Sequence, residues 1–173
     1  MSTTDFTIRR AGVADANWMQ ASVSKVDMRK REGYFHEMCL QQAVGLLALL
    51  VAESGDQTYA GHVKVVWESE YPPFRESEIP EIQDLLVPPH YRRRGVATRL
   101  LDAAEEIVAR RSSVAGLGVG LYAAYGPAQR LYVLRGYVPD GRGAYYSGSP
   151  IAGGQVLPFD DEAILYMTKV LRT

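Results

Sequence analysis

The 173-residue sequence has little of several features that would narrow its function at once. Its single cysteine, Cys39, allows no internal disulfide, which favours a reducing compartment, so we expect a cytoplasmic protein. The three histidines, at positions 36, 62 and 90, have no metal-ligand spacing, and no metal cofactor is expected. The formal net charge of −1 gives no general reason to expect nucleic acid or an anionic membrane as a partner.

Long apolar runs are also missing. The longest, Ala43 to Val51, is far too short to span a bilayer and is better interpreted as a buried strand. No basic and apolar leader opens the sequence, so we expect no targeting segment. With 47% hydrophobic and 23% charged residues the chain can form a sizeable core, and its length predicts one domain over residues 1–173.

The hydrophobic pattern predicts a mixed α/β layout. We expect strands at 6–10, 45–53, 59–67, 81–87, 116–122 and 163–171. We expect helices at 13–25, 29–42 and 96–111, and another from Gly126 to a cap at Gly136. Residues 68–80, with three prolines, and 140–160, with seven glycines or prolines, are expected to be irregular.

The most informative segment is Arg-Arg-Arg-Gly-Val-Ala at 92–97, between an expected strand and an expected helix. The backbone N–H groups of such a loop converge at the positive end of a helix dipole, where a phosphate binds well. Gly95 lets the backbone approach a ligand closely, and Ala97 keeps the next position narrow. The pattern is neither a Walker loop nor a dinucleotide fingerprint. The alternative is an ordinary helix start with solvated arginines.

A second informative segment covers residues 125–137. Pro127 suits the first turn of a helix and Gly136 suits its C-terminal cap. Ala128, Tyr132 and Arg135 recur at helical spacing and share one face with Leu131. Taken alone, Tyr132 would be interpreted as a core aromatic residue of an amphipathic helix.

Together the two segments resemble the GNAT superfamily of N-acetyltransferases. Residues 92–97 match its acyl-CoA pyrophosphate motif, Gln/Arg-x-x-Gly-x-Gly/Ala, and four residues of 125–137 match Asn-x-x-Ala-x-x-x-Tyr-x-x-x-Gly-Phe/Tyr. Tyr125 stands where many members have Asn, so that amide's hydrogen bond to the cofactor is not expected here. The resemblance implies a GNAT fold: a mixed, mostly antiparallel central sheet of about seven strands, flanked by helices. Its fourth and fifth strands would splay apart to admit the acyl-CoA arm.

The resemblance also implies acetyl-CoA as the acyl donor. Residues 93–98 would hold the pyrophosphate, and the backbone of Leu85 and Val87 would pair with the pantetheine arm. The Leu85 N–H would polarise the thioester carbonyl, unless a bulge in the strand shifts the register. The expected cofactor-binding residues are Leu85, Leu86, Val87, Arg92, Arg93, Arg94, Gly95, Val96, Ala97, Thr98, Tyr125, Ala128 and Arg135.

Two residues are candidates for proton transfer. Tyr132 is the candidate general acid, because a phenol with a pKa of about 10 is protonated at neutral pH and can donate to a thiolate. Glu81 is the candidate general base, since histone-acetylating members place a glutamate at the matching position; the alternative is a solvated glutamate at a strand end. Asp84 is the second choice, because strict alternation points it to the opposite face.

The acceptor is suggested by composition alone. Acidic and aromatic residues between positions 68 and 84 suit a small cationic amine, although they also suit an ordinary surface loop. Residues 140–160, with Tyr145 and Tyr146, are either a lid over the acceptor or a surface loop. Alternatives to a small-amine enzyme are a protein or peptide N-acetyltransferase and a non-catalytic acyl-CoA sensor. The resemblance leaves a homodimer open.

Overall fold

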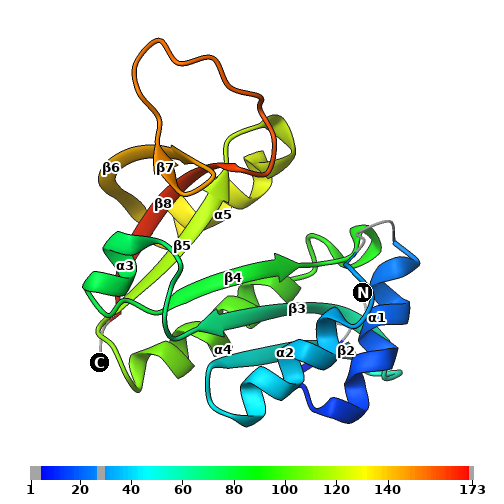
Figure 1. Cartoon of the computed structure of the whole chain (residues 1–173). Coiled ribbons are helices and arrows are strands. Elements are labelled where there is room, and N and C mark those ends of the chain that lie inside the picture. The colour runs from blue at the N-terminus through cyan, green and yellow to red at the C-terminus, as the bar shows by residue number, and fades with distance from the viewer. Residues whose placement is uncertain (1–4, 27–29, 172–173) are drawn as a thin grey trace. The chain divides into compact units, whose positions relative to one another are not determined.

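The computed structural model of the chain describes residues 5–26 and 30–171 (Figure 1). The chain divides into two compact units, which we call unit 1 (Met1–Trp67 with Ile82–Ile107) and unit 2 (Glu68–Glu81 with Val108–Thr173). Strand β4 (Glu81–Leu86) begins with one residue of unit 2 and continues in unit 1. The two units are described in turn.

Unit 1 is built on strands in the order β1, β2, β3 and β4, and the pairs β1–β2 and β2–β3 are antiparallel. Its other strands are β1 (Phe6–Arg10), β2 (Leu47–Ser54) and β3 (Tyr59–Val66). Its α-helices are α1 (Ala16–Ser24), α2 (Tyr34–Ala43) and α4 (Val96–Ala109), the last ending in unit 2. Two 3₁₀ turns, η1 (Val13–Asp15) and η2 (Pro89–Tyr91), complete it.

The core of unit 1 lies on both faces of β2, as its continuous apolar stretch predicts. One face packs on α1 and α2 through a buried cluster that includes Met19, Val23, Phe35, Met38, Cys39, Leu47, Leu49 and Val51. On the other face, a Cβ added at Gly61 of β3 would lie 3.2 Å from Leu100 of α4 and 2.6 Å from the carbonyl oxygen of Leu86. Helix α4 is therefore packed directly against the strands that precede it.

Unit 2 has the strand order β5, β8, β6 and β7, all in antiparallel pairs. These strands are β5 (Val114–Gly120), β8 (Ala163–Val170), β6 (Val138–Tyr146) and β7 (Ser149–Pro150). Its helices are α3 (Pro72–Glu76) and α5 (Gly126–Leu134), with the 3₁₀ turn η3 (Ala123–Tyr125) before α5.

The glycine-rich strand β5 is a packing surface for aromatic rings. A Cβ at Gly116 would lie 2.3 Å from the ring of Phe74, and one at Gly120 would lie 2.4 Å from the ring of Tyr125. Alternate glycines are required because side chains on this face would overlap those rings. Phe74 in turn packs with Tyr71 and Tyr166, whose rings are stacked 3.6 Å apart.

The predicted fold class is confirmed: an α/β fold with a mixed, mostly antiparallel sheet flanked by helices, and the described residues form eight strands instead of about seven. The predicted splay concerns one strand from each unit and stays a prediction, as does the assignment of residues 1–173 to one domain. The helix expected at 29–42 begins only at Tyr34, after Gly33 with a φ of 75°. Its expected start at Arg29 lies outside the described residues.

Two segments expected to be irregular, 68–80 and 140–160, are irregular only in part. Residues 68–80 contain the short helix α3. Its prolines lie in the first turn, where the missing N–H of proline costs no hydrogen bond of the helix. Residues 138–146 form strand β6, which the pattern missed because Gly141 and Gly143 have φ values of 85° and 78°. The register with β8 shifts between Pro139 and Ala144, so the two glycines lie in an irregularity within a real strand.

Candidate active site

Strand β4 carries a backbone irregularity at Asp84. Its φ of 57° is left-handed, which is uncommon for a residue other than glycine and rare inside a strand. Such a residue breaks the two-residue alternation, so the orientation expected for Asp84 from strict alternation does not apply. Leu85 and Val87, the expected partners of the pantetheine arm, follow it and are half-buried, whereas Leu86 is buried.

Asp84 is the centre of a hydrogen-bond network in unit 1. Its Oδ2 accepts hydrogen bonds from the Tyr34 hydroxyl at 2.6 Å and from His62 Nε2 at 3.0 Å. Its Oδ1 accepts one from Lys30 Nζ at 2.5 Å. His62 is completely buried, and its Nδ1 lies 2.5 Å from the hydroxyl of the buried Tyr59.

These contacts decide the ionisation of Asp84. Burial alone would raise the pKa of the carboxyl, but the His62 hydrogen bond and charge, with those of Lys30, outweigh it and lower the pKa well below its usual range. Asp84 is therefore a fixed anion at neutral pH. Burial, followed by the charge of Asp84, raises the pKa of Tyr34, whose hydroxyl stays a donor.

The loop after β4 has the geometry that the sequence predicts for a phosphate site. Arg93 and Gly95 have left-handed φ values of 59° and 84°. The Gly95 carbonyl accepts the first hydrogen bond of α4, from the Arg99 N–H at 3.0 Å. The N–H groups of the three residues at 96–98 therefore have no acceptor within the helix, and a glycine cap supplies no side-chain oxygen to them. N–H groups of this kind at a helix start are what an anion binds.

The three arginines of the loop are exposed but differently anchored. Arg92 donates from Nε to the carbonyl oxygen of Val87 at 3.1 Å, which ties the loop to the end of β4. The Arg94 guanidinium lies 5.9 Å from the centre of the Tyr91 ring, and that ring packs edge-on against Phe6. The loop is thus held from two sides while its positive charge faces solvent.

Helix α5 of unit 2 buries Tyr132, which is 8% exposed. Burial raises the pKa of its phenol to about 12, so the group stays protonated throughout the neutral range. Ala128 and Arg135, on the same helical face, are half-buried. The Tyr125 hydroxyl donates to Asp161 at 2.9 Å, while its ring covers Gly120, so this residue supports the end of β5.

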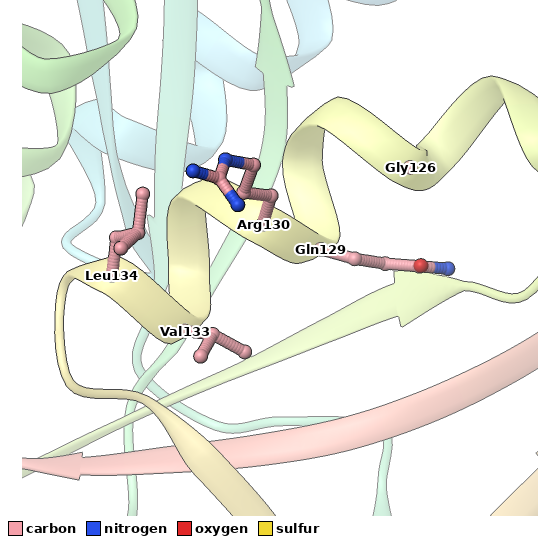
Figure 2. A pocket seen from close by; sticks show the side chains of 5 residues that line it. All are labelled: Gly126, Gln129, Arg130, Val133 and Leu134. Carbon is pink, nitrogen blue, oxygen red and sulfur yellow. The ribbon is translucent and has the colours of Figure 1, made fainter.

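A surface depression lies along α5. Figure 2 shows its lining residues, which all come from this helix: Gly126, Gln129, Arg130, Val133 and Leu134. Gln129 donates from Nε2 to the carbonyl oxygen of Gly120 at 2.8 Å, which joins the helix to the end of β5. The exposed Arg130 supplies a positive charge beside the apolar Val133 and Leu134.

The comparisons with known proteins agree with these features. The model of the Acetyltransferase (GNAT) family matches residues 13–137, more than two thirds of the chain. The chain belongs to the GNAT acetyltransferase family. It is therefore an acyltransferase of a family that uses acetyl-CoA. No curated protein matches the sequence.

Solved structures agree in fold at low sequence identity. A GNAT-family acetyltransferase from Streptococcus pneumoniae is 20% identical, with a TM-score of 0.66 over 96% of this chain and 100% of that one. A chimera of the Vibrio cholerae spermidine N-acetyltransferase SpeG with hSSAT is 16% identical, with a TM-score of 0.66 over 95% of each chain. A Salmonella typhimurium protein solved with its cofactor acetyl-CoA is 18% identical, with a TM-score of 0.66 over 98% and 96%.

The candidate base of this GNAT chain, Glu81, is not a solvated strand end. It is 5% exposed, and its Oε2 accepts a hydrogen bond from the Ser69 hydroxyl at 2.5 Å. That hydroxyl in turn accepts one from the Tyr71 N–H at 3.0 Å. The rings of Tyr71 and Phe74 are buried in the aromatic cluster, so these two do not offer the exposed cation-binding surface that the sequence suggested.

Sequence reasoning missed two sets of residues. The first set centres on His62, which nothing in the chain order links to Lys30, Tyr34 or Asp84. Gln129 and Arg130 were passed over, although their place within the second family segment was a usable signal. In the described ranges, no group of three or more His, Cys, Asp or Glu could hold a metal ion. Nor does any helix there have the length and apolar character that a membrane span requires.

Proposed function

We propose that this GNAT enzyme transfers the acetyl group of acetyl-CoA to a primary amine of a small cationic molecule. The observation that carries the proposal is the loop at 92–98, where left-handed Arg93 and Gly95 lead into a helix whose first N–H groups have no acceptor within the helix. Because the family uses acetyl-CoA, we take the anion that this loop binds to be the pyrophosphate of acetyl-CoA. The thioester supplies an activated acyl group when it is bound.

The proposed donor contacts come from both motifs. In unit 1, the backbone of 93–98 would hold the pyrophosphate, with the charges of Arg92, Arg93 and Arg94 beside it. The strand end at 85–87 would hold the pantetheine arm by backbone hydrogen bonds, and the Leu85 N–H would stabilise the carbonyl oxygen. In unit 2, the proposed contacts are Tyr125, Ala128 and Arg135, and the depression on α5 adds Arg130.

The proposed acid is Tyr132. As the amine nitrogen bonds to the carbonyl carbon and the carbon–sulfur bond breaks, the sulfur gains negative charge. The Tyr132 phenol would donate its proton there. Its pKa of about 12 keeps it protonated before the step.

The proposed base is Glu81, which would take the proton that the attacking ammonium loses. Its buried carboxylate accepts a hydrogen bond from the Ser69 hydroxyl, which orients it. Since it is 5% exposed, a water molecule would relay the proton to it.

The proposed acceptor class rests on two supports. Two of the similar structures are spermidine or spermidine/spermine N-acetyltransferases from Vibrio cholerae, one of them the chimera. The chain also places the fixed anion Asp84 next to Leu85. We further propose a cytoplasmic location, because the only cysteine, Cys39, is buried with a pKa raised by that burial and is no disulfide partner.

The first test is thiol release from acetyl-CoA with and without a panel of polyamines, amino acids, aminoglycosides and short peptides. Release that depends on a small cationic amine supports the proposal. Release with peptides alone would instead indicate a protein N-acetyltransferase. Binding of acetyl-CoA with no release for any acceptor would favour a non-catalytic sensor.

A further inference from the structure

The network around Asp84 contains the two groups by which proteins recognise an alkylammonium ion. Lys30 Nζ lies 2.5 Å from the Asp84 carboxylate and 5.1 Å from the centre of the Tyr34 ring. A carboxylate provides a charge-assisted hydrogen bond, and an aromatic face provides a cation–π contact. The amine of Lys30 thus has the same chemical surroundings that a primary alkylammonium ligand would need.

The carboxylate is held in place by residues other than Lys30. Tyr34 and His62 both donate to Oδ2, and the buried Tyr59 lies against the far nitrogen of His62. Lys30 bonds to the other oxygen, Oδ1. The side chains of Lys30 and Asp84 are 26% and 13% exposed, so the lysine reaches the carboxylate from the more exposed side. If the Lys30 side chain moved away, the hydrogen bonds from Tyr34 and His62 would keep the Asp84 carboxylate oriented and charged.

The position of this network gives it a role. Asp84 directly precedes Leu85, and its left-handed backbone is the kind of strain that concentrates at functional sites. We propose that Lys30 is an internal substitute for the acceptor's ammonium group. Asp84 and the Tyr34 ring form the subsite for a primary alkylammonium, and Lys30 occupies it until an acceptor displaces it. This inference rests on the proposed function, because it assigns the subsite to the amine that is acetylated.

The inference predicts competition. When a binding-competent state is only partly populated, the apparent dissociation constant equals the intrinsic dissociation constant divided by the populated fraction. If the subsite is free for about a tenth of the time, removing the lysine tightens ammonium binding about ten-fold. An arginine at position 30 keeps the competing charge and leaves the affinity near the native value.

The test is a titration of the full-length chain, in the presence of CoA, with n-butylammonium as the probe, followed by NMR chemical shifts. We expect weak binding to the native protein, about ten-fold tighter binding to Lys30→Ala, and near-native binding to Lys30→Arg. Lys25→Ala removes an exposed lysine at the end of α1 and is the matched control, with no change expected. Asp84→Asn should lose saturable binding, with its folding checked by thermal unfolding.

Equal affinity of the native protein and Lys30→Ala would overturn the inference, as would undiminished binding by a folded Asp84→Asn. If Asp84→Asn does not fold, the two Lys30 variants decide between the outcomes. The titration consumes no acetyl-CoA, so it is independent of the thiol-release assay. A transferase that lacks this subsite would release thiol but bind n-butylammonium equally well with and without Lys30. A chain that has the subsite but no turnover would show the tighter binding and release no thiol.

Discussion

Strand β4 carries two carboxylates, Glu81 and Asp84, that accept hydrogen bonds from different kinds of group. Asp84 accepts hydrogen bonds from Lys30, Tyr34 and His62, and its pKa is lowered despite burial. Glu81 is buried with the neutral hydroxyl of Ser69 as its partner. A carboxylate beside a cation is fixed as an anion and is a weak base, whereas one beside a neutral donor can exchange a proton. In the proposed mechanism, the same strand offers Asp84 for binding charge and Glu81 for moving a proton.

The strongest test of this comparison is to remove the carboxylate of Glu81, the proposed base. Glu81→Gln keeps the shape and a hydrogen bond to Ser69 but cannot accept a proton. We expect kcat to fall by about 100-fold or more, as for the loss of a general base. Steady-state thiol release measures it, with the exposed Glu76→Gln of the same unit as the control. A kcat close to native would assign the base elsewhere.

The carboxylate of Asp84 should contribute more to the free energy of unfolding than that of Glu81. Asp84→Asn leaves the ammonium of Lys30 without its anion, and we expect unfolding to become easier by about 3 kcal/mol at pH 7. Asn tolerates the left-handed backbone, so the change is mainly one of charge. Glu81→Gln keeps a hydrogen-bond partner for the Ser69 hydroxyl and should cost about 1 kcal/mol. Denaturant unfolding compares the two variants.

The pH dependence of that difference has a definite sign. The pKa of Asp84 is lower in the folded chain than its unfolded value of about 3.9, so its contribution is fully present above that value. It is lost as the pH falls toward the folded pKa. The gap in stability between the native protein and Asp84→Asn should therefore narrow below about pH 4. A gap that stays constant down to pH 2 would mean that the Asp84 charge contributes nothing.

The next prediction concerns Tyr132, the proposed general acid. Tyr132→Phe should lower kcat by about 100-fold if the phenol protonates the leaving sulfur. Because burial raises the pKa of Tyr132 to about 12, the native activity should show no loss from this group up to about pH 11. Tyr166, whose pKa burial also raises to about 12, is the matched control as Tyr166→Phe. An equal loss in both variants would point to packing instead of proton transfer.

The sequence predicts the parts of this molecule that local chemistry determines. The strand at 6–10 and the helix start at Val96 follow from apolar spacing and from the glycine before the helix, and both are found. Strand β6 was missed because Gly141 and Gly143 usually mark loops, whereas here they lie in a register shift of a sheet. The Asp84 network joins residues 30, 34, 62 and 84, and contacts so distant along the chain leave no periodic pattern.

The smallest effect expected concerns the backbone of the phosphate loop. A Cβ at Gly95 would meet no atom within 4 Å, so the glycine is required only by its φ of 84°. An alanine there costs about 1 kcal/mol to hold the left-handed conformation, and this corresponds to about a five-fold rise in the KM for acetyl-CoA with kcat little changed. Gly95→Asn should restore most of the affinity, since Asn adopts this conformation more readily. Unlike the carboxylates of β4, this position acts through backbone shape, so a rescue by Asn would separate shape from charge as the source of donor binding.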